Sequence, residues 1–355
     1  MWFASDNTAP AAPEVMAALA AANVGHAASY GADAATAHVA AMIREIFEAP
    51  EAEVGLVATG TAANALALAC LCPPWGTVYC HAGAHVQEDE CGAPEFFSGG
   101  AKLTPIDGED GRLDPPRLRR TLADAAPVGV HNVQPGALSL SNATEAGTLY
   151  RPAQVAALAD LAHAAGIPVH MDGARFANAV AALGCTPAEL SWKAGVDVLA
   201  FGGTKNGCLG VEAVILFDPA RAREFELRRK RGGHLFSKHR MLAAQMQAYL
   251  ADGLWLRLAA RANARAADLS RGIAAIAQTL LTHPTEANAV FAGWPRRGHA
   301  AVREAGAVYY PWPANQSFDG RDDLPVTARL VCSWSTGEED VARFLAVLEE
   351  SLGRR

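Results

Sequence analysis

Residues 196–207 read VDVLAFGGTKNG, an apolar run that ends in two glycines and a lone lysine. The apolar part, 196–201, predicts a buried strand, and the Gly-Gly pair marks the turn that follows it. A lysine in a turn is usually exposed, but Lys205 lies between glycines directly after an apolar strand. Desolvation there would lower the pKa of its amine toward the neutral form that imine formation requires.

A second run, HMDGAR, spans residues 170–175 and closes the apolar stretch 168–171. An aspartate at the carboxyl end of a parallel strand faces the crevice in which α/β proteins bind ligands. An ionised Asp172 could hold the N–H of a pyridinium ring. The alternatives are a helix cap or a Mg²⁺ ligand, although no second carboxylate lies nearby to complete a metal site.

A third run, TGTAAN, spans residues 59–64 between a predicted strand and a predicted helix. Its glycine and hydroxyl residues would expose backbone N–H groups at the positive end of the helix, where a phosphate can bind. An ordinary N-cap by Thr61 explains the same pattern equally well.

Short apolar runs alternate with alanine- and leucine-rich helical segments along most of the chain. This alternation predicts an α/β architecture with a buried, mainly parallel sheet. The predicted strands are 54–58, 77–80, 128–133, 168–171, 196–201 and 211–217. The predicted helices are 13–22, 36–47, 62–70, 152–165 and 187–194.

The pattern changes after residue 238, where long helices continue to about residue 281. Short strands at 289–291, 307–310 and 329–334 and a closing helix at 338–352 predict a small α+β unit. We therefore expect a large domain over 1–245, with an N-terminal segment 1–12, and a small C-terminal domain over 246–355.

Composition excludes several classes of protein. The 355 residues carry a formal charge of −7, so the chain offers no field for nucleic acid or an anionic membrane. No apolar run is long enough to span a bilayer, and the first residues lack the pattern of a signal peptide. The odd number of cysteines, 7, argues against a disulfide framework. We expect a soluble cytoplasmic protein.

Taken in order, the three runs resemble the pyridoxal-phosphate (PLP) enzymes of fold type I. Within these, the chain is most similar to the L-threonine aldolase/β-eliminating lyase family, in its low-specificity threonine or phenylserine aldolase branch. The likeness extends from about residue 3 to about residue 350. It is also carried by Phe3-Ala4-Ser5-Asp6-Asn7, by Ala84-His85 and by Arg329-Leu330-Val331.

The resemblance implies retro-aldol cleavage of L-β-hydroxy-α-amino acids (threonine, allo-threonine, phenylserine) to glycine and an aldehyde. It also implies PLP as cofactor, no metal, and a homodimer or homotetramer with sites at the interface. The alternative on the same scaffold is PLP-dependent β-elimination or racemisation of amino acids.

The resemblance assigns roles to individual residues. It makes Lys205, His85 and Asp172 catalytic: Lys205 binds the cofactor as a Schiff base, Asp172 pairs with the pyridine nitrogen, and His85 stacks on the ring. The phosphate would be held by Gly60, Thr61 and the N–H of Ala62. The substrate carboxylate would be held by Ser5, Arg175 and Arg329, with Arg175 also near the cofactor.

A weaker implication concerns a neighbouring subunit. Tyr30 and the basic residues Lys230, Arg231 and Lys238 would reach the partner's site, where a lysine assists the phosphate. A solvated basic helix is the alternative for these residues. Likewise, His85 can be a hydrogen-bonded loop histidine, and Arg175 and Arg329 can be structural ion-pair partners.

One departure from the family pattern bears on substrate binding. Many threonine aldolases carry Glu-Asn-Thr-His, whose histidine contacts the substrate β-hydroxyl, whereas residues 141–145 here read SNATE. Thr144 stands in place of that histidine, and a threonine is no general base near neutral pH. His131, Glu145, His85 or a water are the candidates for that task. The run Glu88-Asp89-Glu90 is expected to be solvated, with one of its members able to reach His85.

Two other classes of protein fit less well. An NAD(P)-dependent dehydrogenase would need GxGxxG where this chain has Thr59-Gly60-Thr61, and an acidic residue at the end of a following strand. A non-catalytic scaffold fits less well, because it has no need of the Lys205 amine and the Asp172 carboxylate expected to face the cofactor ring.

Overall fold

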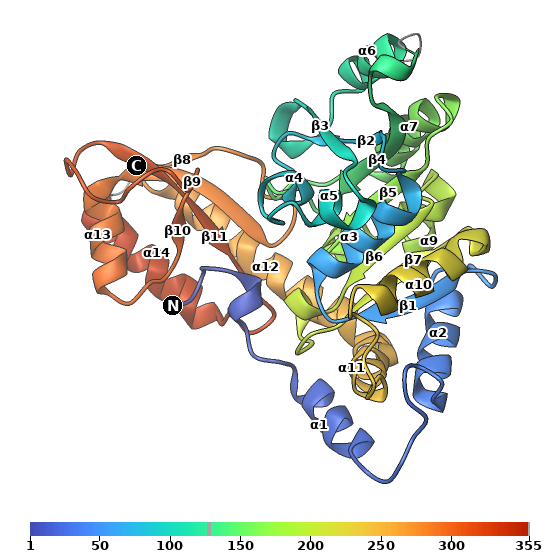
Figure 1. Ribbon diagram of the computed structural model, residues 1–355. Helices are drawn as coiled ribbons and strands as arrows, with labels where there is room; N and C mark the ends of the chain where they lie inside the picture. Colours follow the sequence, from blue (N-terminus) through green and yellow to red (C-terminus); the bar gives the residue numbers. More distant parts are fainter. Residues whose placement is uncertain (126–128, 354–355) are drawn as a thin grey trace.

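The computed structural model describes residues 1–125 and 129–353, which form two sheets with their helices (Figure 1). The larger sheet has seven strands in the order β1-β7-β6-β5-β4-β2-β3, and only β7 runs antiparallel to its neighbours. The strands are β1 (Glu53–Val57), β2 (Gly76–His81), β3 (Lys102–Ile106), β4 (Gln134–Ser141), β5 (Val169–Gly173), β6 (Val198–Gly202) and β7 (Glu212–Leu216). The predicted α/β class with a mainly parallel sheet is confirmed.

Helices cover both faces of this sheet, and the alternation of side chains along each strand separates two cores. On β6, Val198 and Ala200 pack toward α3 (Gly60–Leu71), whereas Leu199 and Phe201 pack on the opposite face. Because both faces are covered, the strand is apolar throughout, as its sequence indicated. The face with α3 also carries α5 (Ala93–Ser98) and α10 (Ala222–Arg231). The other carries α1 (Pro13–Ala22), α2 (Ala34–Ile46), α6 (Pro115–Ala125), α7 (Pro152–Ala164), α8 (Phe176–Leu183), α9 (Pro187–Leu190) and α11 (Arg240–Leu250).

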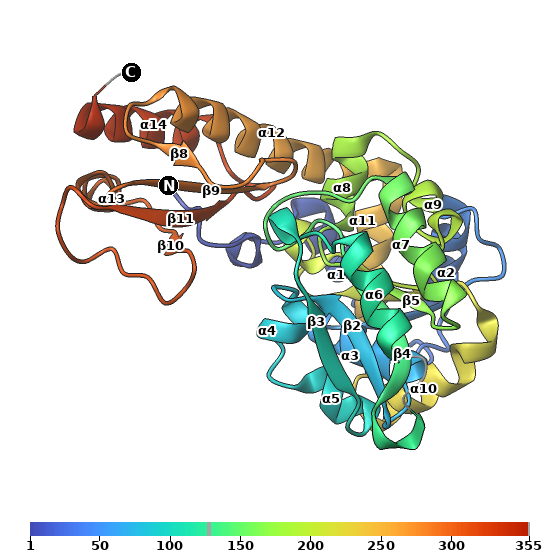
Figure 2. The ribbon, with the colours of Figure 1, turned by 90° about the horizontal axis from the view of Figure 1, so that it is seen from above.

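The smaller sheet is antiparallel and has its own core. Its strands are β8 (Leu280–Leu281), β9 (Ala289–Pro295), β10 (Tyr310–Pro311) and β11 (Pro325–Val331), in the order β10-β11-β9-β8. The helices α12 (Leu254–Ala275), α13 (Arg296–Glu304) and α14 (Glu338–Leu352) pack with it (Figure 2). The division between 245 and 246 stays a prediction.

The N-terminal segment joins the two parts of the molecule. Phe3 is completely buried in the smaller core, and its backbone bonds Val308 and Val331. The chain then passes through the 3-10 helix η1 (Asp6–Thr8) to α1, which packs beside the larger sheet (Figure 1). Residues 5–8 therefore lie between the two cores.

One predicted strand is wrong. Residues 129–131 form a 3-10 helix, η3 (Gly129–His131), and the strand begins later, at Gln134; Val128 lies outside the described residues. The sequence Gln134-Pro135-Gly136 resembles a turn, yet Pro135 pairs with Thr77 inside the sheet. A Cβ on Gly136 would lie 2.2 Å from Cys72 Sγ, so this glycine permits close packing rather than a turn.

Two further features are the state of the cysteines and the character of the helices. All seven cysteines are free thiols. Within residues 1–125 and 129–353, no helix has the length and apolar character needed to cross a bilayer.

Candidate active site

Five of the predicted site residues meet at one edge of the larger sheet. Asp172 lies near the carboxyl end of β5, and Lys205 follows the carboxyl end of β6 in η5 (Thr204–Asn206). Since β7 is antiparallel, its first residue, Glu212, pairs with Gly202 at the same edge. A cavity of about 350 Å³ opens there, lined among others by the predicted residues Gly60, Thr61, His85, Asp172 and Lys205.

Asp172 is held as a carboxylate. Its Oδ1 accepts a hydrogen bond from the N–H of Ala174 at 2.9 Å, and its Oδ2 accepts one from Asn64 Nδ2 at 2.9 Å. Burial alone would raise the pKa of Asp172, but Lys205 and the Ala174 N–H outweigh burial and lower it. A buried anion thus faces a cavity that also contains a lysine.

The turn before α3 forms the expected concave surface, with a different cap. The hydroxyl of Thr59, not Thr61, caps the helix by accepting from the N–H of Ala62 at 3.1 Å. The Ala62 N–H expected to hold the phosphate is therefore already bonded to Thr59. A Cβ on Gly60 would meet nothing within 4 Å, so this glycine borders open space in the cavity.

His85 lies at the start of α4 (His85–Glu88), and its side chain is 28% exposed. Its Nδ1 is 2.9 Å from Oε1 of Glu90, whose side chain is completely buried. The hydrogen bond to Glu90 raises the pKa of His85, against the opposing effect of burial. The expectation that the acidic run is solvated is wrong for Glu90 and holds for Glu88 and Asp89, which are exposed.

Arg175 forms a buried ion pair with a residue that the sequence did not single out. Its Nε and Nη2 donate to the two carboxylate oxygens of Asp6 at 2.7 and 2.9 Å. Asn288 Nδ2 also donates to Asp6, at 3.0 Å. Arg175 is thus held in a fixed orientation by Asp6, as the ion-pair alternative required.

Arg329 lies on β11 of the smaller sheet, with its guanidinium over the Trp312 ring. Burial and the nearby positive charge of Arg175 lower the pKa of Arg329. Two arginines from different sheets therefore repel each other next to the site, which favours an anion between them. Ser5, also expected here, caps η1 by accepting from the Asn7 N–H at 3.2 Å.

Thr144 is used within its own loop. Its hydroxyl lies 2.8 Å from the Thr148 hydroxyl and accepts from the Thr148 N–H at 3.2 Å, and the residue is 2% exposed. His131 precedes the amino end of β4, the opposite end of the strand from the edge at which Asp172 lies. Glu145, beside Thr144, acts electrostatically on His85, Arg175 and Arg329.

The residues expected to serve a neighbouring subunit lie together outside the cavity. The ammonium group of Lys230, on α10, is 4.2 Å from the ring centre of Tyr30, which is 48% exposed. The Tyr30 N–H donates to the carbonyl of Ser237, next to the exposed Lys238. Arg231 lines a different hollow.

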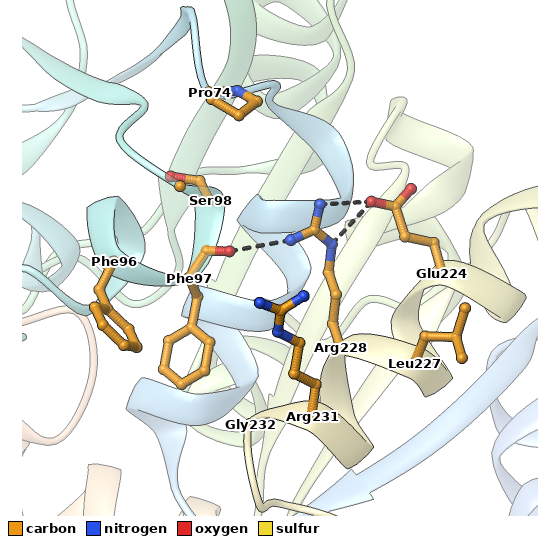
Figure 3. A pocket seen from close by; sticks show the side chains of 10 residues that line it. Pro74, Phe96, Phe97, Ser98, Glu224, Leu227, Arg228, Arg231 and Gly232 are labelled. Carbon is orange, nitrogen blue, oxygen red and sulfur yellow. Dashed lines mark hydrogen bonds and ion pairs between the residues drawn. The ribbon is translucent and has the colours of Figure 1, made fainter.

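That hollow, of about 760 Å³, is larger than the cavity at Lys205, but none of the predicted catalytic residues lines it (Figure 3). It lies beyond the opposite end of α3, between Phe96 and Phe97 on α5 and Leu227 on α10. Its charged groups include Arg228, which is paired with Glu224 and donates to the Phe97 carbonyl. It shares no lining residue with the cavity at Lys205.

Sequence reasoning missed several residues that line or support the cavity. Asn64 lies on α3 one turn after Gly60, and its position on the same helix face is the signal that could have identified it. Asn7, Thr204 and Glu212 also line the cavity, and the burial of Glu212 raises its pKa to about 7. The apolar neighbours of Glu212 in sequence, Val211 and Ala213, gave no sign of this.

The chain is similar to known proteins in sequence and in structure. The family model described as beta-eliminating lyase matches residues 3–293. A low specificity L-threonine aldolase of Pseudomonas sp. (strain NCIMB 10558) is 44% identical over 344 residues, covering 97% of this chain and 96% of that protein. A protein of the same name from Pseudomonas aeruginosa is 44% identical, covering 96% and 94%. The solved structure of Leishmania major threonine aldolase is 27% identical, with a TM-score of 0.91 over 99% of both chains.

Proposed function

The chain belongs to the beta-eliminating lyase family, and on this premise we propose that it is a PLP-dependent aldehyde-lyase that cleaves L-threonine to glycine and an aldehyde. The observation that carries the proposal is the cavity that Lys205 and Asp172 both line. At about 350 Å³ it falls within the range of roughly 300–1,000 Å³ typical of small-molecule pockets.

The residues present fit the cofactor. PLP, when bound, supplies an electron sink for the pair released when a bond at the substrate Cα breaks. Lys205 would hold it through its amine, and the buried Asp172 carboxylate would hold the pyridine nitrogen in its protonated form. Gly60 and Thr61, at the positive end of α3, would receive the phosphate, for which the open space beside Gly60 leaves room. His85 would cover the ring.

The substrate carboxylate would bind between Arg175 and Arg329, with Ser5 at its edge. Asp6 fixes two nitrogens of Arg175. Within residues 1–125 and 129–353 the third, Nη1, makes no hydrogen bond, so it would be free for a ligand. Glu145, which acts on both arginines and on His85, would lie near the substrate side chain. Arg175 and Arg329 together orient the bond to be broken, and orientation selects among reactions at Cα.

The proton of the β-hydroxyl needs an acceptor. The loop bonds of Thr144 and the distance of β4's amino end from the site speak against Thr144 and His131. His85 and Glu145 remain as side chains that act on the site, and His85 lines the cavity. We assign the task to His85. The same assignment extends to phenylserine and to L-allo-threonine, the Cβ epimer of threonine, because both also carry a β-hydroxyl.

The assembly and its compartment are part of the proposal. The exposed Tyr30 and Lys230, held together outside the cavity, support a homodimer or homotetramer in which they approach a partner's site. Seven unpaired thiols support a reducing, cytoplasmic compartment.

The test is a spectrum followed by an assay. Purified protein should be yellow, should lose its absorbance band on borohydride reduction, and should carry the reduced label on Lys205. Lys205→Ala should abolish the band and the activity. Lys193→Ala removes a lysine that pairs with Glu48 and does not line the cavity, and should leave both unchanged.

The assay separates the two reactions of this scaffold. Aldehyde and glycine released from threonine and phenylserine support the aldolase. Ammonia and a keto acid from serine, without aldehyde from threonine, would point to β-elimination instead. A colourless protein with no affinity for added PLP would refute the cofactor assignment as well.

A further inference from the structure

Glu90 is a buried carboxylate to which the reaction as described gives no task. It follows α4, and its side chain is completely buried. Its Oε1 is 2.9 Å from His85 Nδ1 and accepts from Asn64 Nδ2 at 2.8 Å. Within the described residues, its Oε2 has no hydrogen-bond partner. A carboxylate in such a place is costly unless its partners are fixed.

The bond to Glu90 decides which nitrogen of His85 carries hydrogen. Burial raises the pKa of Glu90, while the hydrogen bonds from His85 and Asn64 lower it. As a carboxylate, Glu90 only accepts hydrogen bonds, so His85 Nδ1 is then the donor. The neutral ring then keeps its lone pair on Nε2. Among residues 1–125 and 129–353, nothing bonds Nε2, and the ring lines the cavity. His85 is thus held in the form that can accept a proton from a ligand.

Asn64 connects this pair to Asp172. Its Nδ2 donates one hydrogen to Glu90 Oε1 and one to Asp172 Oδ2, at 2.8 and 2.9 Å. Two carboxylate partners require the amide nitrogen, not the oxygen, on this side. The ligand atoms of His85, Glu90 and Asp172 lie within 4.8 Å of one another, a spacing that could suit a metal. The expectation that no second carboxylate lies near Asp172 is therefore wrong. The amide hydrogens already bridge the two carboxylates, so hydrogen bonds explain the cluster.

We propose that Glu90 is a positioning residue for the cleavage reaction, which orients His85 so that Nε2 receives the β-hydroxyl proton. The inference rests on the proposed function. As the proton moves to Nε2, the O–H electron pair forms the aldehyde C=O, and the pair of the broken Cα–Cβ bond stays with the glycine half. Glu90 touches neither substrate nor cofactor and acts through His85.

Four charged groups act most strongly on His85, and Asp89 lines the same cavity. Glu90, Asp172 and Glu145 raise its pKa, and Lys205 lowers it. A change at Glu90 leaves the other three in place. Glu90→Gln keeps the size of the side chain and removes its charge, so it isolates the contribution of the carboxylate.

The first measurement follows His85 directly in the holoenzyme. The protein is labelled with ¹³C-histidine, and the His85 signal is assigned by its loss in His85→Asn. In wild type we expect the neutral ring to carry its hydrogen on Nδ1. In Glu90→Gln we expect the His85 pKa to fall by about one unit or more, because an adjacent carboxylate shifts a pKa by roughly 1–3 units. Glu90→Asp should restore part of the difference, and Glu88→Gln, at an exposed neighbour, should not move it.

The second measurement is the pH profile of kcat/KM for threonine. Activity requires unprotonated Nε2, so it declines as the pH falls through the His85 pKa. Glu90→Gln should move this acid limb to lower pH by the same amount as the NMR titration, and should reduce kcat by roughly 10–100-fold. In a His85→Asn background the same change should have little further effect.

Three results would overturn the proposal. They are an Nε2–H tautomer in wild type, a His85 pKa unchanged in Glu90→Gln, and an equal loss of kcat from Glu90→Gln with and without His85. The tautomer is measured in wild type, so it decides the matter even if Glu90→Gln does not fold. The NMR results do not require turnover, so they stand apart from a failure to find aldehyde.

Discussion

Glu212 is a carboxylate buried beside η5, the 3-10 helix that contains Lys205, and folding changes its pKa. Its Oε2 accepts from the Gly203 N–H at 2.9 Å, and burial raises its pKa to about 7 from an ordinary value of 4.5. A carboxyl whose pKa is raised by folding makes the folded state less stable as the pH rises through that interval.

We expect Glu212→Gln to remove this penalty. The variant should match wild type near pH 4.5 and exceed it above pH 7 by up to about 3 kcal/mol, from 1.36 kcal/mol per pKa unit. Urea unfolding of both holoenzymes at pH 5 and pH 8 measures the difference. An equal difference at the two pH values would show that the carboxyl does not titrate in this interval.

Folding shifts the pKa of Asp6 in the opposite direction from that of Glu212. Burial raises its pKa, but Arg175 and Lys205 outweigh burial and lower it to about 2 from 3.8. Its contribution to stability is therefore present at neutral pH and is lost as the pH falls from about 4 to about 2.

We expect Asp6→Asn to destabilise the protein by about 3 kcal/mol at pH 7, because it leaves the buried Arg175 without its anion. The deficit should shrink below pH 4, and KM for threonine should rise as Arg175 loses its fixed orientation. Urea unfolding against pH and steady-state kinetics measure the two effects. Asp323→Asn, at an exposed pair with Arg321, is the control and should change little. A deficit that persists undiminished at pH 2 would contradict the assignment.

Among the elements, the amino end of α3 is a place where a substitution should weaken cofactor binding without changing the stability of the fold. Gly60 is the first residue of the helix and borders open space in the cavity. We expect Gly60→Val to leave the free energy of unfolding of the apoprotein within about 1 kcal/mol of wild type and to weaken PLP binding at least tenfold, because its side chain enters the space proposed for the phosphate.

Spectroscopic titration with PLP and urea unfolding measure the two quantities. Thr59→Ala is the matched comparison, since it should cost about 1 kcal/mol by loss of the helix cap while adding no bulk. Unchanged PLP affinity in Gly60→Val would place the phosphate elsewhere.

Strands covered by helices on both faces could be predicted from the sequence, because a short, continuously apolar run between turns is typical of such a strand. Strands β5 and β6 were expected within two residues of their observed ends; β5 carries Asp172, and β6 leads to Lys205 in η5. The strand β4 was misplaced, since Pro135 and Gly136 serve packing where they resemble a turn. Local pattern does not distinguish a glycine needed for close approach from one needed for a bend.

The site was predictable only in part, because the local sequence does not show which side chains the fold brings together. Glu88, Asp89 and Glu90 look alike in sequence, and only the orientation of the single-turn helix α4 turns Glu90 inward. The partner of Arg175, Asp6, is 169 residues away along the chain. Contacts of this range depend on how the two sheets meet, which no local pattern contains.

At the scale of the whole molecule, both sheets supply residues to one site. Asp172 and Lys205 belong to the larger sheet, Arg329 to the smaller, and Asp6 lies on the segment between them. Relative movement of the two sheets would therefore change the distance between the cofactor and carboxylate positions. We therefore expect substrate binding to depend on how the two sheets are placed relative to each other.

The neighbouring-subunit assignment has a complementation test. Lys205→Ala removes the amine, and a Lys230→Ala/Lys238→Ala double variant removes the basic residues expected to act across the interface. If each site uses Lys205 from one subunit and these lysines from another, mixing the two inactive variants by joint refolding should restore up to about a quarter of wild-type activity in a dimer. A double variant that retains its activity on its own would assign the lysines to a solvated surface. If both variants are inactive and their mixtures stay inactive, the lysines do not act across the interface.

The position of β7 also has a consequence for synthesis on the ribosome. Strand β1, which precedes the phosphate turn, is an edge strand whose sheet neighbour is β7, and Glu53 pairs with Leu216. The strand that leads into Thr59 and Gly60 must therefore wait until some 160 further residues have left the exit tunnel, and long-range pairing of this kind is slow. Nascent chains that end before β7 should not retain PLP, so capture of the cofactor follows the emergence of residue 216 from the tunnel.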